Sequence, residues 1–270
     1  MANSRADKGR GRRSDVVKPA ASKPRKPRAS KSSLRPFYAL LALVAAVGLA
    51  AIAWQSSRGS NHPQVTTVDT TIAAGPGEGR LFGNATAPVK ILEFADFECP
   101  ACAQWATITE PDVRSRILGT GLASLRFFDF PLPQHKNSMA ASNAAACAAE
   151  QGRFWEMHDK LFQGQNDWNT EATSSPKKVF AGYAKDLGLD TDKWGSCFDS
   201  QKYQSAILAN RGEGERRHLA QTPTFVIGNK MVPGVITYDD MKAMIDSASR
   251  AVADAAVSRA DSQRKASAKK

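Results

Sequence analysis

Apolar and polar positions along the chain follow helix or strand periods in several places. The first clear pattern is the uncharged run 37–54, which is rich in Ala, Leu and Val. A helix of this length spans about 27 Å at about 1.5 Å per residue, close to the thickness of the hydrocarbon core of a bilayer. The run therefore predicts a single transmembrane helix.

From residue 81 onward the pattern predicts strands and helices in alternation. The apolar, β-rich run Val89–Phe97 predicts a strand. A helix-prone segment follows, and Glu110-Pro111 should kink or end it because proline lacks a backbone N–H. Further helices are expected within 138–162, 179–187 and 193–208, further strands at 125–130, 224–227 and from 231, and a last helix capped by Thr237. Trp155 and His158 fall among packing positions, which indicates core residues.

Basic residues are concentrated at the N-terminus. The first 36 residues hold 12 of the 37 Lys and Arg and 2 of the 26 Asp and Glu, which leaves 25 basic and 24 acidic residues in the rest of the chain. This balance gives the body of the protein no general electrostatic footprint for nucleic acid. The basic head before an apolar run instead predicts a cytoplasmic N-terminus and an extracytoplasmic domain, hence a single-pass protein of the cell membrane.

Composition divides the chain into five parts. We expect a basic, disordered head over 1–36, the transmembrane helix over 37–54, a Gly- and Pro-rich linker over 55–80 in which 65–68 suits a short strand, an α/β domain over 81–257, and a disordered tail over 258–270. A cleaved signal peptide is the alternative for the N-terminus, because Ala51-Ile52-Ala53 resembles a cleavage site and Trp54 would then begin the mature chain.

The tetrad Cys99-Pro100-Ala101-Cys102 follows the first strand and opens a helix. The start of a helix stabilises a thiolate through unpaired N–H groups and the macrodipole, so Cys99 is the expected nucleophile. Cys102 is the expected resolving thiol. Half of a zinc site and a structural cysteine pair are the alternatives, but no second CxxC or HxxxH accompanies the tetrad. The order of elements around it predicts an α/β thioredoxin-like fold with an inserted helical block.

These residues resemble the DsbA-type thiol:disulfide oxidoreductases, in particular the membrane-anchored branch of bacterial envelopes. The resemblance covers nearly all of residues 82–248. It rests on Gly83-Asn84, Ala87-Pro88-Val89, Glu93-Phe94, Asp96, the CPAC tetrad, Phe130-Pro131-Leu132 with His135, Cys147-Ala148, Phe154-Trp155-Glu156-Met157-His158 and Thr222-Pro223-Thr224-Phe225.

The resemblance implies roles for residues that spacing does not single out. Pro223 matches a cis-proline that faces the redox cysteines, and the backbone of Thr222 would help to dock substrate; an ordinary trans-proline at a strand start is the alternative. Glu93 matches a buried acid that relays a proton to Cys102, against the alternative of a surface carboxylate. Asp96 and His135 fit the pattern with a structural role.

The two remaining cysteines, Cys147 and Cys197, would form a structural disulfide that clamps the helical block, a pairing that some related anchored proteins also have. Two free buried thiols are the alternative. The chain departs from the family pattern at Ala101, where strongly oxidising members carry a polar residue, and at Ala220-Gln221, where glycine commonly precedes Thr-Pro.

The resemblance implies an enzyme that forms disulfides in exported proteins with free cysteines. It needs no organic cofactor or metal, and its expected recycling partner is a quinone-linked membrane oxidase such as a vitamin K epoxide reductase-like protein. A disulfide reductase or isomerase uses the same tetrad, and a non-catalytic peptide-binding scaffold of the envelope would keep the fold without turnover. The direction of electron flow depends on a reduction potential that the sequence does not specify.

Overall fold

The computed structural model describes residues 35–57, 64–67 and 75–268, with side chains in the first range described for 37–51. The expected basic head therefore lies almost wholly outside the described residues. Contacts divide the chain into two units, residues 1–60 and 61–270, and each is described by itself.

The first unit contains helix α1 (Arg35–Ser57), which covers the apolar run 37–54. Its described side chains, from residue 37 to 51, are exposed to the surroundings. Within the part of the chain that the structure describes, no helix combines the length and apolarity that crossing a membrane requires.

The second unit is built on a six-stranded sheet with the order β1-β6-β5-β3-β4-β2. Its strands are β1 (Thr66–Thr67), β2 (Arg80–Gly83), β3 (Val89–Ala95), β4 (Ala123–Asp129), β5 (Thr224–Ile227) and β6 (Lys230–Pro233). Strands β3 and β4 are parallel, and the other neighbours are antiparallel. The predicted strands at 89–97, 125–130, 224–227 and from 231 are thus all present, and two residues of the linker add an edge strand.

Strand β3 has two faces because successive side chains in a strand point in opposite directions. Val89, Ile91, Glu93 and Ala95 share one face, and all four are buried. Phe94 lies on the other face, where it stacks on Phe128 with ring centroids 4.9 Å apart. Glu93 is therefore a carboxylic acid on an otherwise apolar face.

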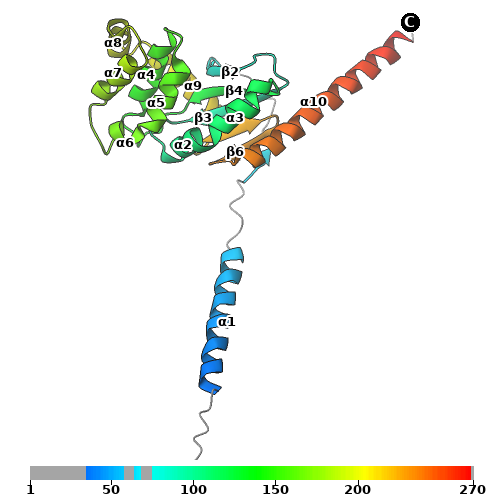
Figure 1. The fold of residues 1–270 in the computed structure, drawn as a ribbon. Coiled ribbons are helices and arrows are strands. Elements are labelled where there is room, and N and C mark those ends of the chain that lie inside the picture. The colour runs from blue at the N-terminus through cyan, green and yellow to red at the C-terminus, as the bar shows by residue number, and fades with distance from the viewer. Residues whose placement is uncertain (1–34, 58–63, 68–74, 269–270) are drawn as a thin grey trace, which may run out of the picture. The chain divides into compact units, whose positions relative to one another are not determined.

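Helices cover the sheet and form a block beside it (Figure 1). Along the chain they are α2 (Pro100–Gln104), α3 (Glu110–Arg116), α4 (Ser138–Ala149), α5 (Phe154–Gln163), α6 (Gln165–Trp168), α7 (Lys177–Asp186), α8 (Thr191–Asp199), α9 (Gln204–Arg216) and α10 (Tyr238–Ser267), with a short 3₁₀ turn at Leu118–Thr120. The helices α4 to α9 between β4 and β5 form the inserted block, so the α/β thioredoxin-like fold with a helical insertion is confirmed.

The segment after Cys102 differs from the expected helix. Helix α2 passes into a π-helical turn over Trp105–Thr109, and α3 continues from Glu110. Pro111 stands in the first turn of α3, where its missing N–H needs no partner. The proline therefore starts a new helical segment, and the wider π turn joins the two segments.

The chain is also more helical than expected toward its C-terminus. The single helix expected over 193–208 is two helices, because Gln201 adopts a left-handed φ of 50° and ends α8. Helix α10 continues to Ser267 and extends away from the sheet, where a disordered tail was expected from residue 258 (Figure 1). No glycine or proline follows Gly234, and a Lys242–Asp246 ion pair one turn apart supports the helix.

The end of the expected linker belongs to the folded domain. The backbone N–H of Gly79 donates to the side-chain oxygen of Asn210 on α9, at 3.1 Å, and Asn210 donates in turn to Asp129. A side chain on Gly77 would meet the carbonyl oxygen of Ala209 at 2.7 Å. Residues 75–80 therefore pack against α9 and lead directly into β2.

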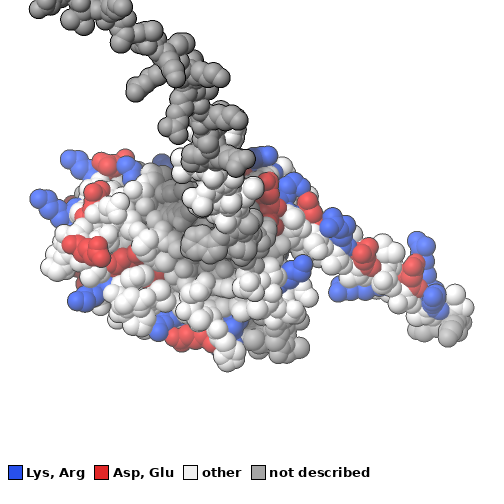
Figure 2. All heavy atoms as spheres, turned by 90° about the horizontal axis from the view of Figure 1, so that it is seen from below, with Lys and Arg blue, Asp and Glu red and all other residues white. Residues whose placement is uncertain are grey.

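The predicted cap of the last helix is present. The Thr237 hydroxyl accepts a hydrogen bond from the Asp240 backbone N–H at 3.1 Å. On the face in Figure 2, basic and acidic side chains are interspersed, which agrees with the nearly neutral balance of the domain.

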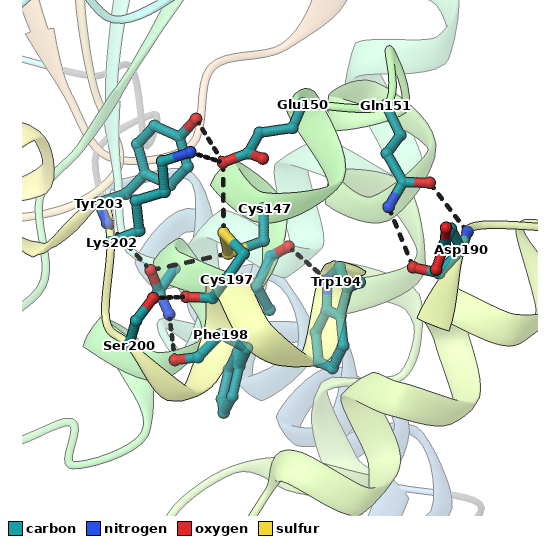
Figure 3. Close-up of a disulfide and its surroundings, with 12 residues drawn as sticks. Cys147, Glu150, Gln151, Asp190, Trp194, Cys197, Phe198, Ser200, Lys202 and Tyr203 are labelled. Carbon is teal, nitrogen blue, oxygen red and sulfur yellow. Dashed lines mark hydrogen bonds and ion pairs between the residues drawn. A yellow bond between two sulfur atoms is a disulfide. The ribbon is translucent and has the colours of Figure 1, made fainter. Parts of the chain in front are cut away.

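A disulfide joins Cys147 on α4 to Cys197 on α8, the pairing that the resemblance implies (Figure 3). Trp194 lies beside it and donates its indole N–H to the carbonyl of Ala144 at 3.1 Å. Tyr203 and Lys202 both reach Glu150 on the other side of the bond. The disulfide thus ties α8 to α4, the most buried helix of the inserted block.

We expect the double substitution Cys147→Ala with Cys197→Ala to destabilise the domain. A sequence separation of 50 residues corresponds to about 4 kcal/mol of loop-closure entropy in the unfolded chain. Urea unfolding of the variant and the wild type measures the difference, with the free energy of unfolding expected to fall by about 2–4 kcal/mol. An unchanged unfolding midpoint would contradict a stabilising role for the bond.

Candidate active site

Asp96 shapes the turn that brings Cys99 to the start of α2. Its carbonyl accepts from the Cys99 N–H at 3.0 Å, and its carboxylate accepts from the Glu98 N–H at 2.8 Å. Cys99 is the residue just before the helix, with φ −76° and ψ 122°, and Pro100 is its first helical residue. The cysteine therefore lies where the helix has unpaired N–H groups.

The same carboxylate holds the loop after β4. Asp96 also accepts from the Leu132 N–H at 2.8 Å and contacts the His135 ring at Nδ1 at 2.7 Å, and the Ser138 hydroxyl donates to it. The hydrogen bond with Asp96 raises the pKa of His135. These contacts give Asp96 and His135 the structural role that was expected.

The loop before β5 lies opposite Cys99. The Thr222-Pro223 peptide bond is cis, as the resemblance implies, and the Cys99 thiol lies 3.4 Å from the carbonyl oxygen of Thr222. The Gly234 N–H donates to the Pro223 carbonyl at 2.7 Å and anchors the loop to the end of β6. Thr222, Pro223 and Cys99 therefore meet although 123 positions separate the first and the last.

The two sulfurs of the CPAC tetrad differ in electrostatics. The thiol of Cys102 donates to the sulfur of Cys99, and this contact, with further help from Thr222 and backbone N–H groups, lowers the pKa of Cys99 from 9.0 to about 6. Burial raises the pKa of Cys102 well above its ordinary value. The expected division into an acidic and a less acidic thiol is present, but Cys99 is only 8% exposed because the Thr222 loop covers it.

Glu93 is fully buried in the sheet, on the same face of β3 as Ala95. Its neighbours across the sheet are Phe127 on β4 and Phe225 on β5. Burial raises its pKa well above the ordinary value, and the nearby Glu110 carboxylate raises it further. Neither of its carboxyl oxygens has a hydrogen-bond partner among the described residues.

The π turn places a second carboxylic acid near Glu93. Residues five apart face the same side of a π-helix, so Trp105 and Glu110 both point inward, and each is at most 1% exposed. The Trp105 ring packs on Phe225, with centroids 4.7 Å apart. Arg114, one turn further, binds one oxygen of Glu110 at 2.8 Å.

His158 reaches the same place from α5. Its ring packs on Phe127, with centroids 5.1 Å apart, and its side chain is fully buried. Its Nδ1 lies 2.9 Å from Asp159 and 3.2 Å from the Arg114 guanidinium, and its Nε2 lies 3.9 Å from the free oxygen of Glu110. His158 is a core residue, as expected, but it also has polar neighbours.

Sequence reasoning did not identify Glu110, Arg114 or Asp159 as site residues. The dipeptide Glu110-Pro111 indicated only a kink or the end of a helix. One signal was available, because Arg114 follows Glu110 at the i,i+4 spacing of an ion pair. Within the described residues no group of three or more His, Cys, Asp and Glu side chains could hold a metal ion.

A family model described as Thioredoxin matches residues 76–247, which is more than half of the chain. The chain therefore belongs to the thioredoxin family. Its fold is similar to that of the oxidised BdbD from Bacillus subtilis, with a TM-score of 0.57 at 21% identity over 70% of this chain and 100% of that one. It is also similar to DsbA from Chlamydia trachomatis, with a TM-score of 0.56 at 20% identity over 63% of this chain and 90% of that one.

Curated relatives are of two kinds. The probable disulfide bond formation protein D of Bacillus anthracis is 26% identical over 172 residues, 61% of this chain and 75% of the relative. The Na(+)/H(+) antiporter NhaA 3 of Salinispora tropica is 30% identical over 182 residues, 67% of this chain. The chain spans only 26% of the length of that antiporter. Together with the fold, these matches confirm the predicted DsbA-type resemblance.

We expect Cys99 and Cys102 of the reduced protein to titrate far apart. Thiolate absorbance should rise with a midpoint near pH 6, and iodoacetamide at pH 7 should label Cys99 and spare Cys102. Because the Cys99 pKa is lower in the folded protein than in the unfolded chain, the reduced form should gain stability as the pH rises from about 6 toward 9. A midpoint above pH 8, or equal labelling of both thiols, would contradict this electrostatic asymmetry.

Proposed function

We propose that the protein is a thiol:disulfide oxidoreductase that oxidises cysteine pairs in exported proteins. The arrangement of Cys99 carries this proposal. An acidic thiol stands at the start of a helix, a buried thiol follows one turn later, and the Thr222-Pro223 loop faces the first sulfur at 3.4 Å. A scaffold that only binds peptides has no use for such an asymmetric sulfur pair.

The reaction balances without a cofactor. A substrate thiolate attacks the Cys99 sulfur of the oxidised enzyme, the Cys99–Cys102 bond breaks, and Cys102 leaves with the electron pair and takes a proton. A second substrate thiolate then attacks the mixed disulfide and releases Cys99. Two electrons pass to the enzyme. The two substrate thiols lose two protons, Cys102 takes up one, and the net release to solvent is one because Cys99 stays a thiolate near pH 7.

The acidity of Cys99 supports the oxidising direction over the reductase and isomerase alternatives. A thiol with a pKa of about 6 is mostly ionised at pH 7, and the ionisation draws the equilibrium toward the reduced enzyme. Relative to an ordinary cysteine this favours substrate oxidation by about tenfold. The pKa of Cys99 is lowered although Ala101 has no side-chain donor for its sulfur, because Cys102 and Thr222 supply hydrogen bonds.

A membrane tether and an extracytoplasmic domain belong to the same proposal. Their support is the sequence, in which a strongly basic head precedes the uncharged run 37–54. The structural disulfide between Cys147 and Cys197 suits that side of the membrane, because cytosolic thiols are kept reduced. Regeneration needs an electron acceptor, for which the resemblance implies a quinone-linked membrane oxidase of the vitamin K epoxide reductase-like type.

Substitution of each redox cysteine should have a different effect. Cys99→Ser removes the sulfur that is attacked, so oxidation of a dithiol peptide should fall to background without any covalent adduct. Cys102→Ser leaves Cys99 able to form a disulfide with substrate but removes the thiol that would attack this mixed disulfide and release the substrate. Mixed disulfides should therefore accumulate on a non-reducing gel. The Cys147→Ala, Cys197→Ala double variant is the matched control and should keep most of its activity.

Two results would contradict this assignment. Adducts on Cys102 in the Cys99→Ser variant would reverse the roles of the two thiols. Wild-type oxidation rates in both single variants would contradict a redox function of the tetrad, and a peptide-binding scaffold would then be the better explanation.

Fractionation of cells that produce the full chain should place the protein in the membrane. Alkaline carbonate should fail to release it, and protease added outside should remove the domain while the basic head stays protected. Release of a protein that begins near Trp54 would contradict the tether and favour a cleaved signal peptide.

A further inference from the structure

Five of the buried polar atoms that lack a hydrogen-bond partner among the described residues belong to one cluster of Glu93 and side chains packed near it. They are both carboxyl oxygens of Glu93, Oε2 of Glu110, Nε2 of His158 and the indole nitrogen of Trp105. The side chains come from β3, the π turn, α3 and α5. Buried polar groups are nearly always hydrogen-bonded in folded proteins, so a group of five calls for an explanation.

The cluster has an inner and an outer end. At the inner end, Glu93 and Ala95 share one face of β3, and Ala95 packs in the same apolar cluster as Cys102. At the outer end, Asp159 is 40% exposed and binds Arg114 at 2.9 Å. The fully buried His158 and Glu110 lie between these ends.

His158 is oriented to pass a proton between the two ends. Its Nδ1 faces Asp159 and Arg114 at the outer end, and its Nε2 faces the free oxygen of Glu110 at 3.9 Å. An imidazole takes up a proton at one nitrogen and releases one at the other. The 3.9 Å gap exceeds a hydrogen bond, so transfer across it requires a small side-chain shift or a bridging water.

The groups around Glu93 are apolar on the neighbouring strands and charged on the side of α3. Its cross-strand neighbours Phe127 and Phe225 are apolar. The titratable groups that face it are Glu110 and Arg114 from α3, with His158 and Asp159 behind them on α5. Arg114 stays charged and holds one oxygen of Glu110, which leaves the other oxygen to His158.

We propose that Glu110 and His158 form a proton path from solvent at Asp159 to Glu93, and that this path supplies the proton that Cys102 takes up on reduction. The inference rests on the proposed function. When the disulfide breaks, Glu93 donates its proton to the Cys102 sulfur, Glu110 restores the proton of Glu93, and His158 restores that of Glu110. A proton from solvent enters at Asp159, so each relay group ends in its starting state.

The rate at which dithiothreitol reduces the oxidised enzyme tests this path. Wild type and variants are mixed with the dithiol between pH 5 and pH 9, quenched with an alkylating reagent and quantified by mass spectrometry. Glu110→Gln keeps the size of the side chain and cannot release a proton as an acid. We expect its rate relative to wild type to fall about tenfold at pH 8, less than the full effect of a direct general acid, and to approach wild type at pH 5.

The dependence on pH separates a relay from a structural role. Hydronium reaches the site more often at low pH, so a missing relay matters least there, whereas a packing defect would slow the reaction at every pH. Asp129→Asn is the matched control because Asp129 is also buried with a raised pKa but contacts Asn210 on α9, outside the cluster. It should react at the wild-type rate throughout.

Asp159→Asn tests the outer end with little risk to folding, because Asp159 is half exposed. We expect a smaller loss at pH 8, about threefold, with the same recovery at pH 5. Wild-type rates in Asp159→Asn at every pH, or an equal loss at all pH values in Glu110→Gln, would overturn the path. If Glu110→Gln does not fold, Asp159→Asn alone decides. A wild-type enzyme that does not react with the dithiol would refute the proposed function itself.

Discussion

The hydrogen-bonded position of β3 between β4 and β5 is the constraint on which the redox site depends. Seven residues of β3 pair with β4, and four pair with β5. Because Phe94 is paired with Thr224, the loop that contains Thr222 and Pro223 must end beside the turn that begins at Asp96. The register of one strand thus brings the first sulfur to a segment far away in the sequence, and the hydrogen bond from the Gly234 N–H to the Pro223 carbonyl anchors that segment.

Differences in burial and hydrogen bonding then give the two sulfurs different pKa values. Both belong to one short helix, but Cys99 precedes it and Cys102 lies inside its first turn, against the apolar core. Burial keeps the Cys102 thiol protonated. This thiol therefore donates a hydrogen bond to the Cys99 sulfur, and that hydrogen bond lowers the pKa of Cys99. The Thr222 loop covers Cys99, which is only 8% exposed and whose thiol donates to the Thr222 carbonyl, and this burial opposes part of the lowering of the Cys99 pKa.

The π turn determines which side chains after α2 point toward the sheet. In an uninterrupted α-helix, residues five apart face different directions, so Trp105 and Glu110 would not both point to the sheet. The extra residue in the turn turns the side chain of Glu110 toward Glu93 and aligns Arg114 with Asp159 on α5. Two carboxylic acids and a histidine in an apolar core are costly to stability, and a functional site is where such a cost is commonly retained.

Local order along the chain was determined by the sequence itself. The apolar, β-rich run Val89–Phe97, the CPAC tetrad that follows and the cap at Thr237 each depend on neighbouring residues, and all are present. The strand pattern did not single out Glu93, which only the family resemblance indicated as a buried acid. Only the tertiary structure decided where α8 ends, because Gln201 carries no breaker signal. It also decided that Arg114 meets His158, since 44 positions separate them and contact between them depends on how whole helices pack.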